Sequence, residues 1–199
     1  SSSKSFLSNK ILDANKIKIL PNSVNMDIFY EKKGDKLYDL ATLARLVPEK
    51  RLDILIKVVY LLKKNHPNIK VAVAGEGPMK SKLMYLSEKL NLESNINFLG
   101  FTNAPHELYN QSKLFVLTSE TEGLPRTMIE AMSCGLPCIV SNVGDIQNVV
   151  KDGINSYVIS PHDNILGYVR AADKLLTNKS LYKRFSLLSK EFAVENFSY

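Results

Sequence analysis

Short apolar runs alternate along this chain with longer stretches in which apolar residues recur at helical spacing. The apolar runs are short, rich in β-branched residues and bounded by glycine, proline or polar clusters, which is typical of buried strands. The pattern predicts strands at Ile17–Leu20, Leu37–Ala44, Ile69–Ala74, Ile96–Leu99, Leu114–Thr118, Pro137–Ser141 and Ser156–Ile159.

The stretches between these runs predict helices. In the first of them, Leu52, Leu55, Ile56, Val59 and Leu62 fall on one helical face. The predicted helices are Arg51–Asn65, Pro78–Leu90, Pro105–Asn110, Arg126–Cys134, Ile146–Lys151, Asn164–Thr177 and Leu181–Val194. Strand–helix alternation of this kind predicts an α/β, Rossmann-like, doubly wound fold with a mostly parallel sheet, which binds ligands beyond the carboxyl ends of its strands.

Composition narrows the class of protein. A chain of 199 residues with 45% hydrophobic content is long enough to bury one core. No apolar run approaches the roughly 20 residues that a membrane span needs. The net charge of +6 comes mainly from lysine, and a solvated surface explains it better than an anionic-membrane patch. Tryptophan is absent and the cations are not massed with aromatics, so we expect no nucleic acid partner.

Two cysteines, Cys134 and Cys138, flank Gly135-Leu136-Pro137. Their spacing matches neither C-x-x-C nor a zinc framework, although a redox or metal pair stays an alternative. We expect two reduced core residues, which fits a cytoplasmic protein.

The segment Ser119–Val140 carries the strongest functional signal. Glu122 and Glu130 stand eight residues apart, so they project toward one side of the predicted helix. The turn Gly123-Leu124-Pro125 opens that helix with proline near its first turn. Free backbone N–H groups and the positive end of the helix then favour an anion above the strand.

Two other predicted strand ends carry suggestive residues. Arg45 and Lys50 follow one strand, and two fixed cations at such a junction can bridge a diphosphate. Gly75 and Gly77 follow the next strand. Glycines there either let the backbone approach a ligand or serve only a sharp turn, and the sequence leaves both explanations open.

These segments together resemble the group 1, or family 4, retaining glycosyltransferases. Ser119–Val140 resembles their E-x7-E signature, and Arg45–Arg51 resembles their R-L-x-x-x-K segment, with Arg51 where many relatives have glycine. Gly75–Pro78 resembles their G-x-G-P turn, and Asn95–Phe101 resembles a loop near the nucleotide base. Phe101 is also open to explanation as ordinary packing.

The resemblance implies a role for each residue. Glu122, Arg45 and Lys50 are the implied catalytic residues, with Glu122 facing the donor sugar and the two cations stabilising the departing diphosphate. Glu130 is expected to bind the ribose hydroxyls. The other implied donor-binding residues are Gly75, Gly77, Phe101, Gly123 and Leu124. The resemblance implies no cofactor and no metal.

The resemblance also implies a place in a longer protein. Such enzymes have two Rossmann-like domains, the GT-B fold, and residues 1–199 resemble the C-terminal donor-binding domain, with residues 1–25 resembling the interdomain linker. The acceptor domain is then absent, and we expect the chain to be inactive alone. The implied reaction moves a sugar from a UDP- or GDP-sugar to a hydroxyl of a glycan, polysaccharide or lipid-linked acceptor, with retention of the anomeric configuration. The implied location is the cytoplasm, and peripheral contact with a membrane stays an open alternative. The alternative is a non-catalytic nucleotide-binding or assembly module.

Two departures from the family pattern concern the loops around the site. Ser23 stands where the family commonly has glycine. The family commonly has a Gly-Gly pair followed by glutamate where this chain has Gly144-Asp145-Ile146-Gln147-Asn148. This difference leaves open an atypical donor sugar.

Overall fold

The computed structural model describes residues 22–198, apart from the side chain of Asn148, and it forms a six-stranded sheet in the order β3-β2-β1-β4-β5-β6. Every adjacent pair of strands is parallel. The strands are β1 (Tyr38–Leu43), β2 (Val71–Ala74), β3 (Ile96–Gly100), β4 (Ser112–Leu117), β5 (Cys138–Ser141) and β6 (Tyr157–Ile159). The predicted parallel α/β fold is therefore confirmed.

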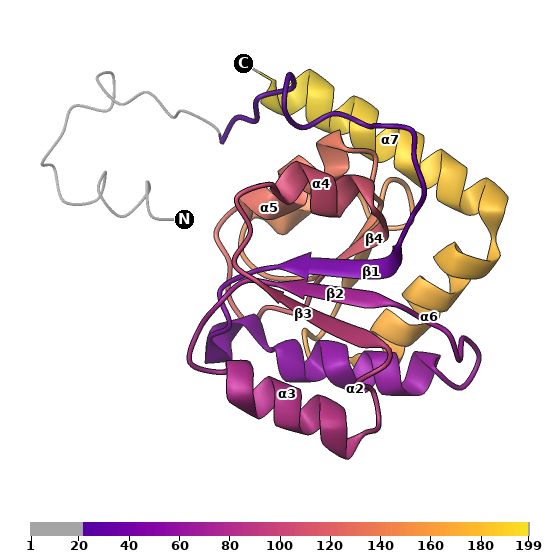
Figure 1. Cartoon of the computed structure of the whole chain (residues 1–199). Helices are drawn as coiled ribbons and strands as arrows, with labels where there is room; N and C mark the ends of the chain where they lie inside the picture. The colour runs from indigo at the N-terminus through magenta and orange to yellow at the C-terminus, as the bar shows by residue number, and fades with distance from the viewer. Residues whose placement is uncertain (1–21, 199) are drawn as a thin grey trace, which may run out of the picture.

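Helices cover both faces of this sheet, with α2 and α3 on one side and α4 and α5 on the other (Figure 1). The α-helices are α2 (Leu52–Leu62), α3 (Lys80–Lys89), α4 (Pro105–Asn110), α5 (Arg126–Ser133), α6 (Ile165–Thr177) and α7 (Lys179–Phe197). Two short 3-10 turns are η2 (Pro48–Lys50) and η3 (Ile146–Asn148). Residues of α2, α3 and α6 share one buried cluster, and those of α4, α5 and the end of α7 share another.

The burial of each strand follows its place in the sheet. All four residues of β2 and of β5 are buried, because helices cover both faces there. In the edge strand β3 only Ile96 is buried, and the positions after it alternate between exposed and half-buried. At the other edge, Asp152 Oδ1 accepts a hydrogen bond from the N–H of Val158 in β6 at 2.9 Å. This contact caps an edge N–H that would otherwise be open to another strand.

Two of the predicted elements differ from the structure, and a third cannot be compared with it. The predicted strand Ile17–Leu20 lies outside the described residues. The predicted helix Ile146–Lys151 is wrong, because only the 3-10 turn η3 forms. The N–H of Lys151 donates to Asn155 Oδ1 at 2.9 Å, so the chain leaves the helical hydrogen-bond pattern there. Helix α7 begins earlier than predicted, since Asn178 Oδ1 accepts the N–H of Leu181 at 2.9 Å and caps the helix there.

The two ends of the described chain meet. Val24 forms a parallel bridge with Ser198, and its N–H donates to the carbonyl of Phe197 at 2.8 Å. Among the described residues, no helix is long and apolar enough to cross a membrane. The assignment of residues 1–25 to a linker stays a prediction, because residues 1–21 lie outside the described part.

Both cysteines are free and buried, as expected of core residues. Burial raises the pKa of the Cys134 thiol to about 12 and raises that of Cys138 further. Each therefore stays protonated near neutral pH and packs as a small apolar side chain.

Candidate functional site

The candidate site lies where the chain changes direction across the sheet. Strands β1 and β4 are neighbours, while the strands that follow them in sequence, β2 and β5, lie on opposite sides of this pair. Ligands of open parallel sheets bind beyond the carboxyl ends of the strands at such a point. The segments that leave β1 and β4 here carry Arg45, Lys50 and Glu122.

Lys50 and Glu122 form an ion pair across these two loops. Lys50 Nζ lies 2.7 Å from Glu122 Oε1, and the hydroxyl of Ser119 donates to the same oxygen at 2.7 Å. Among the described residues, Oε2 of Glu122 accepts no hydrogen bond. One oxygen of this carboxylate is therefore held by the protein and the other is available to a ligand.

Backbone contacts fix the loop that carries Lys50. The buried hydroxyl of Thr118, just after β4, lies 3.0 Å from the carbonyl oxygens of both Lys50 and Arg51. The N–H of Glu120 donates to the carbonyl of Glu49 at 2.8 Å. The loop after β4 thus holds η2 in place and brings Lys50 against Glu122.

A cavity of about 240 Å³ opens at this point. It brings together all three predicted catalytic residues, Arg45, Lys50 and Glu122. The cavity is completed by Leu43, Ala44, Leu117, Pro125, Arg126 and Thr127. Arg45 is exposed, and no described carboxylate pairs with it. Its guanidinium is therefore a cation that an anionic ligand can engage directly.

Arg126 is a site residue that the sequence reasoning missed. It lines the cavity, and its Nε donates to Glu130 Oε1 at 3.0 Å. Its position in the first turn of α5, between Glu122 and Glu130, is the sequence feature that could have indicated a place in the site. The sequence pattern predicted Arg126 only as the start of a helix.

Glu130 lies beside the cavity rather than in its lining. Only 7% of the residue is exposed, and the buried hydroxyl of Tyr109 donates to its Oε2 at 3.0 Å. Burial raises the pKa of Glu130, and the hydrogen bonds from Tyr109 and Arg126 oppose that rise. The carboxylate is thus fixed in orientation by two donors, and its expected ribose contact stays a prediction.

The turn between Glu122 and α5 offers unused donors. Among the described residues, the N–H groups of Gly123 and Leu124 find no acceptor. The carbonyl of Leu124 accepts a hydrogen bond from Asn22 Nδ2 at 2.9 Å, which joins the end of the predicted linker to this turn. Exposed N–H groups before a helix suit a phosphate or sugar oxygen.

Gly75 and Gly77 have a structural explanation. Gly75 has φ +126°, and a Cβ atom there would lie 1.9 Å from the carbonyl oxygen of Ala44. A Cβ on Gly77 would lie 2.5 Å from that of Leu46. The turn after β2 therefore packs directly on the loop that carries Arg45, and neither glycine lines the cavity. Their expected contact with the donor stays a prediction.

Phe101 follows β3 and is 79% exposed, so packing into the core does not explain it. It does not line the cavity either. An exposed aromatic ring at the carboxyl end of a strand is a surface on which a planar base can stack.

The loop after β5 packs against the backbone of Glu122 and Gly123, in the turn before α5. Gly144 has φ +58°, and a Cβ there would lie 2.0 Å from the carbonyl oxygen of Glu122. The N–H of Asp145 donates to the carbonyl of Gly123 at 3.1 Å. The departure from the family pattern at Asp145 thus lies directly against the predicted donor-binding turn.

Arg51 adopts the left-handed backbone conformation, with φ +46° and ψ +40°. This explains why glycine suits the position in relatives, because a side chain there is strained. The guanidinium contacts Asp53 at 3.2 Å, Glu120 at 3.6 Å and His162 Nε2 at 3.3 Å, all away from the cavity.

We expect Arg51→Gly to be more stable than Arg51→Ala by about 1 kcal/mol. Both changes remove the same partly exposed ion pairs, which contribute roughly 0–1 kcal/mol, but only glycine relieves the left-handed backbone. Denaturant unfolding of the two variants measures the difference. An alanine variant as stable as the glycine variant would contradict the assigned strain.

The sequence profile of the family Glycosyl transferases group 1 matches residues 26–191. The chain is 33% identical over 157 residues to poly(ribitol-phosphate) alpha-N-acetylglucosaminyltransferase from Staphylococcus aureus. The aligned region covers 78% of this chain and 32% of that protein. The chain is 30% identical over 185 residues to UDP-Gal:alpha-D-GlcNAc-diphosphoundecaprenol alpha-1,3-galactosyltransferase from Escherichia coli, covering 85% and 48% respectively.

A crystal structure of a variant of S. aureus TarM with fondaparinux, alpha-GlcNAc-glycerol and UDP superposes with a TM-score of 0.85 at 30% identity. The match covers 98% of this chain and 39% of that one. This chain therefore spans less than half the length of each of these relatives. The profile match and the shared fold show that the chain belongs to the group 1 glycosyltransferases.

Proposed function

We propose that this chain is the donor-binding half of a retaining glycosyltransferase that takes its sugar from a UDP- or GDP-sugar. The observation that carries the proposal is the convergence of Arg45, Lys50 and Glu122 on one cavity at the carboxyl ends of β1 and β4. UDP is the favoured nucleotide, because it is named in the E. coli relative and is bound in the TarM structure.

The two cations are suited to the diphosphate of the donor. Arg45 has no carboxylate partner among the described residues, and Lys50 shares its charge with one oxygen of Glu122. As the sugar leaves, charge grows on the diphosphate while the sugar becomes oxocarbenium-like. Arg45, Lys50 and the N–H groups at the start of α5 then stabilise the departing charge, an effect typically worth roughly a hundred- to thousandfold in rate for one donor.

The glutamates take different roles in this proposal. Glu122 presents its available oxygen to the donor sugar, on the same face as the departing phosphate. Departure and attack on that one face retain the anomeric configuration without a covalent enzyme intermediate. Glu130, held by Tyr109 and Arg126, receives the ribose hydroxyls. The exposed ring of Phe101 and the backbone around it lie toward the base.

The acceptor is proposed from relatives. The S. aureus enzyme is named for poly(ribitol-phosphate) and the E. coli enzyme for a sugar-diphosphoundecaprenol. We therefore infer a glycan or lipid-linked hydroxyl acceptor, bound by a second domain at a cytoplasmic site, and a reaction that proceeds without a metal or cofactor.

Calorimetry with a nucleotide panel tests the proposal. We expect this chain to bind UDP more tightly than GDP, and to bind 2′-deoxy-UDP more weakly by about 1.5–3 kcal/mol, the usual range for a lost hydrogen bond to a charged group. The ligand change leaves the protein intact, so folding does not confuse the result. Equal affinity for UDP and 2′-deoxy-UDP would reject the ribose role of Glu130, and binding of no nucleotide would reject the proposed function.

A further inference from the structure

A second cavity, of about 490 Å³, lies at the opposite ends of the strands from the candidate donor site, where β1 and β4 begin. It is lined by Lys36 before β1, by Lys113 at the start of β4, and by residues of α6 and α7. Figure 1 shows α6 and α7 meeting on the side where β1 begins. The length of β4 separates the two cavities by on the order of 15–20 Å.

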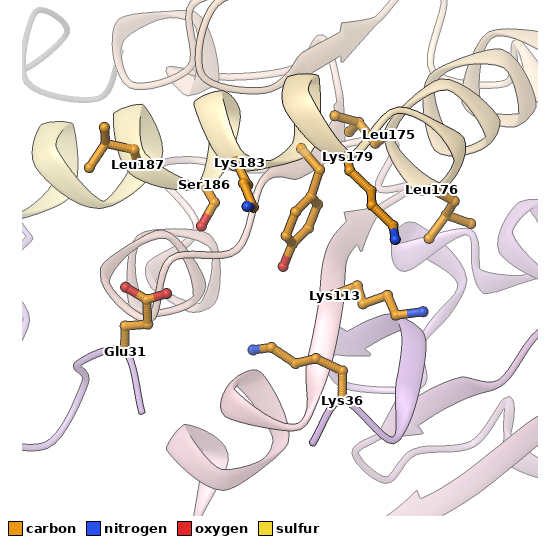
Figure 2. Close-up of a pocket in the computed structure, with 10 residues that line it drawn as sticks. Glu31, Lys36, Lys113, Leu175, Leu176, Lys179, Lys183, Ser186 and Leu187 are labelled. Atoms are coloured by element: carbon orange, nitrogen blue, oxygen red, sulfur yellow. The ribbon is translucent and has the colours of Figure 1, made fainter. Parts of the chain in front are cut away.

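Four lysines line this cavity, and they are Lys36, Lys113, Lys179 and Lys183. Glu31 is the one carboxylate in the lining, and Lys190 already pairs with it at 3.1 Å. Figure 2 shows Lys179 and Lys183 descending from α7 toward the space that Lys36 and Lys113 border from the other side. The cavity is therefore strongly cationic.

The charges of most of these lysines are not neutralised. Lys113 pairs with Asp39 at 2.7 Å. Among the described residues, Lys36 Nζ donates only to the backbone carbonyl of Asn110, at 2.8 Å. Burial lowers its pKa, and the charge of the Glu31 carboxylate partly opposes that shift. No described carboxylate pairs with Lys179 or Lys183, which stand four residues apart on α7 and repel one another. An anion in the cavity would offset the repulsion between Lys179 and Lys183 and the cost of burying the Lys36 ammonium.

The rest of the lining is apolar or offers a hydrogen-bond donor. Leu175, Leu176 and Leu187 form an apolar wall, and Leu187 is 55% exposed. The phenol of Tyr182 also lines the cavity, and burial raises its pKa to about 12, so it keeps its proton near neutral pH. Among the described residues, this hydroxyl has no hydrogen-bond partner.

We propose that this cavity binds a phosphate group carried on an apolar molecule. Three ammonium groups that form no ion pair with a described carboxylate are more than a single carboxylate requires, and they match the charge of a phosphate ester or diphosphate. The Tyr182 hydroxyl donates to a phosphate oxygen, and the leucine wall contacts the apolar part. The site is separate from the donor cavity and does not depend on the proposed donor chemistry.

The test uses one phosphate ester in two forms. Dihexanoyl phosphatidic acid supplies the soluble form and is followed by calorimetry, while vesicles of phosphatidylcholine with phosphatidic acid supply the bilayer form and are followed by sedimentation. Binding of either form supports the proposal and identifies its source. We expect Lys179→Glu/Lys183→Glu to weaken that binding roughly tenfold or more.

Two controls locate the binding. Lys82→Glu/Lys89→Glu makes the same charge change on exposed lysines of α3 and is expected to leave affinity unchanged. Lys50→Ala, in the donor cavity, is also expected to leave it unchanged. The proposal is overturned if neither form binds, if either control weakens binding as much as the α7 variant, or if pyrophosphate binds the same site as tightly as the amphiphile.

Discussion

Lys50→Ala is expected to weaken UDP binding by about 1.5–3 kcal/mol, which is roughly a tenfold to 150-fold loss of affinity. The physical reason is that Lys50 is one of the three cations that line the cavity, with Arg45 and Arg126, and its ammonium group is already fixed there by Glu122. Binding of uridine should hardly change, because uridine carries no phosphate. Calorimetry with both ligands measures the two effects side by side.

The matched control is Glu122→Gln, which removes the same ion pair but keeps the cation. The ammonium group of Lys50 is then no longer paired with a carboxylate, so its attraction to the diphosphate is not weakened. The affinity for UDP should therefore equal or exceed that of the original chain. Loss of UDP and uridine binding to the same extent in Lys50→Ala would show that Lys50 supports the fold instead. Weaker UDP binding in Glu122→Gln would show that the pair itself, rather than the cation, organises the site.

Gly75→Ala is expected to destabilise the protein by about 3 kcal/mol or more. The new methyl group would lie 1.9 Å from the Ala44 carbonyl oxygen, and the residue would be held at φ +126°. Backbone on both sides prevents easy relaxation, so overpacking and backbone strain add. Denaturant unfolding measures the change in free energy.

Gly34→Ala is the control for that experiment. A Cβ at Gly34 meets no atom within 4 Å, and its backbone is not left-handed. Its stability should therefore stay within about 0.5 kcal/mol of the original chain. A Gly75 variant that unfolds at the same denaturant concentration as the Gly34 variant would show that the two loops can separate without loss of stability.

The strand pattern predicted that the residues after β1 and β4 lie on one side of the sheet, because parallel strands place their carboxyl ends together. The choice of Arg45, Lys50 and Glu122 among those residues came from the family resemblance. The strands after residue 21 were predicted from continuous apolar runs, which are typical of a parallel sheet covered on both faces. Fold class thus follows from local pattern, and the main cluster of the site follows from that pattern together with the family resemblance.

What the sequence could not predict depends on packing between distant segments. Tyr109 lies on α4, and nothing local indicates that its hydroxyl reaches Glu130 on α5. The role of Gly75 stayed open, because its close approach to Ala44 joins two turns that are far apart in the chain. The turn at Ile146 was mistaken for a helix, because Ile146, Val149 and Val150 have helical spacing, whereas the side chain of Asn155 takes the N–H of Lys151 and ends the turn.

The support of the site by backbone carbonyls has a consequence for its tolerance of mutation. Thr118 holds the carbonyls of Lys50 and Arg51, and Gly144 lies against that of Glu122. Neither Thr118 nor Gly144 lines the cavity that holds Arg45, Lys50 and Glu122. Substitutions at either position would displace the ligand-facing side chains without touching a ligand. A saturation screen scored by UDP binding should therefore rank these two residues alongside Lys50, although a screen scored by unfolding should separate them from it.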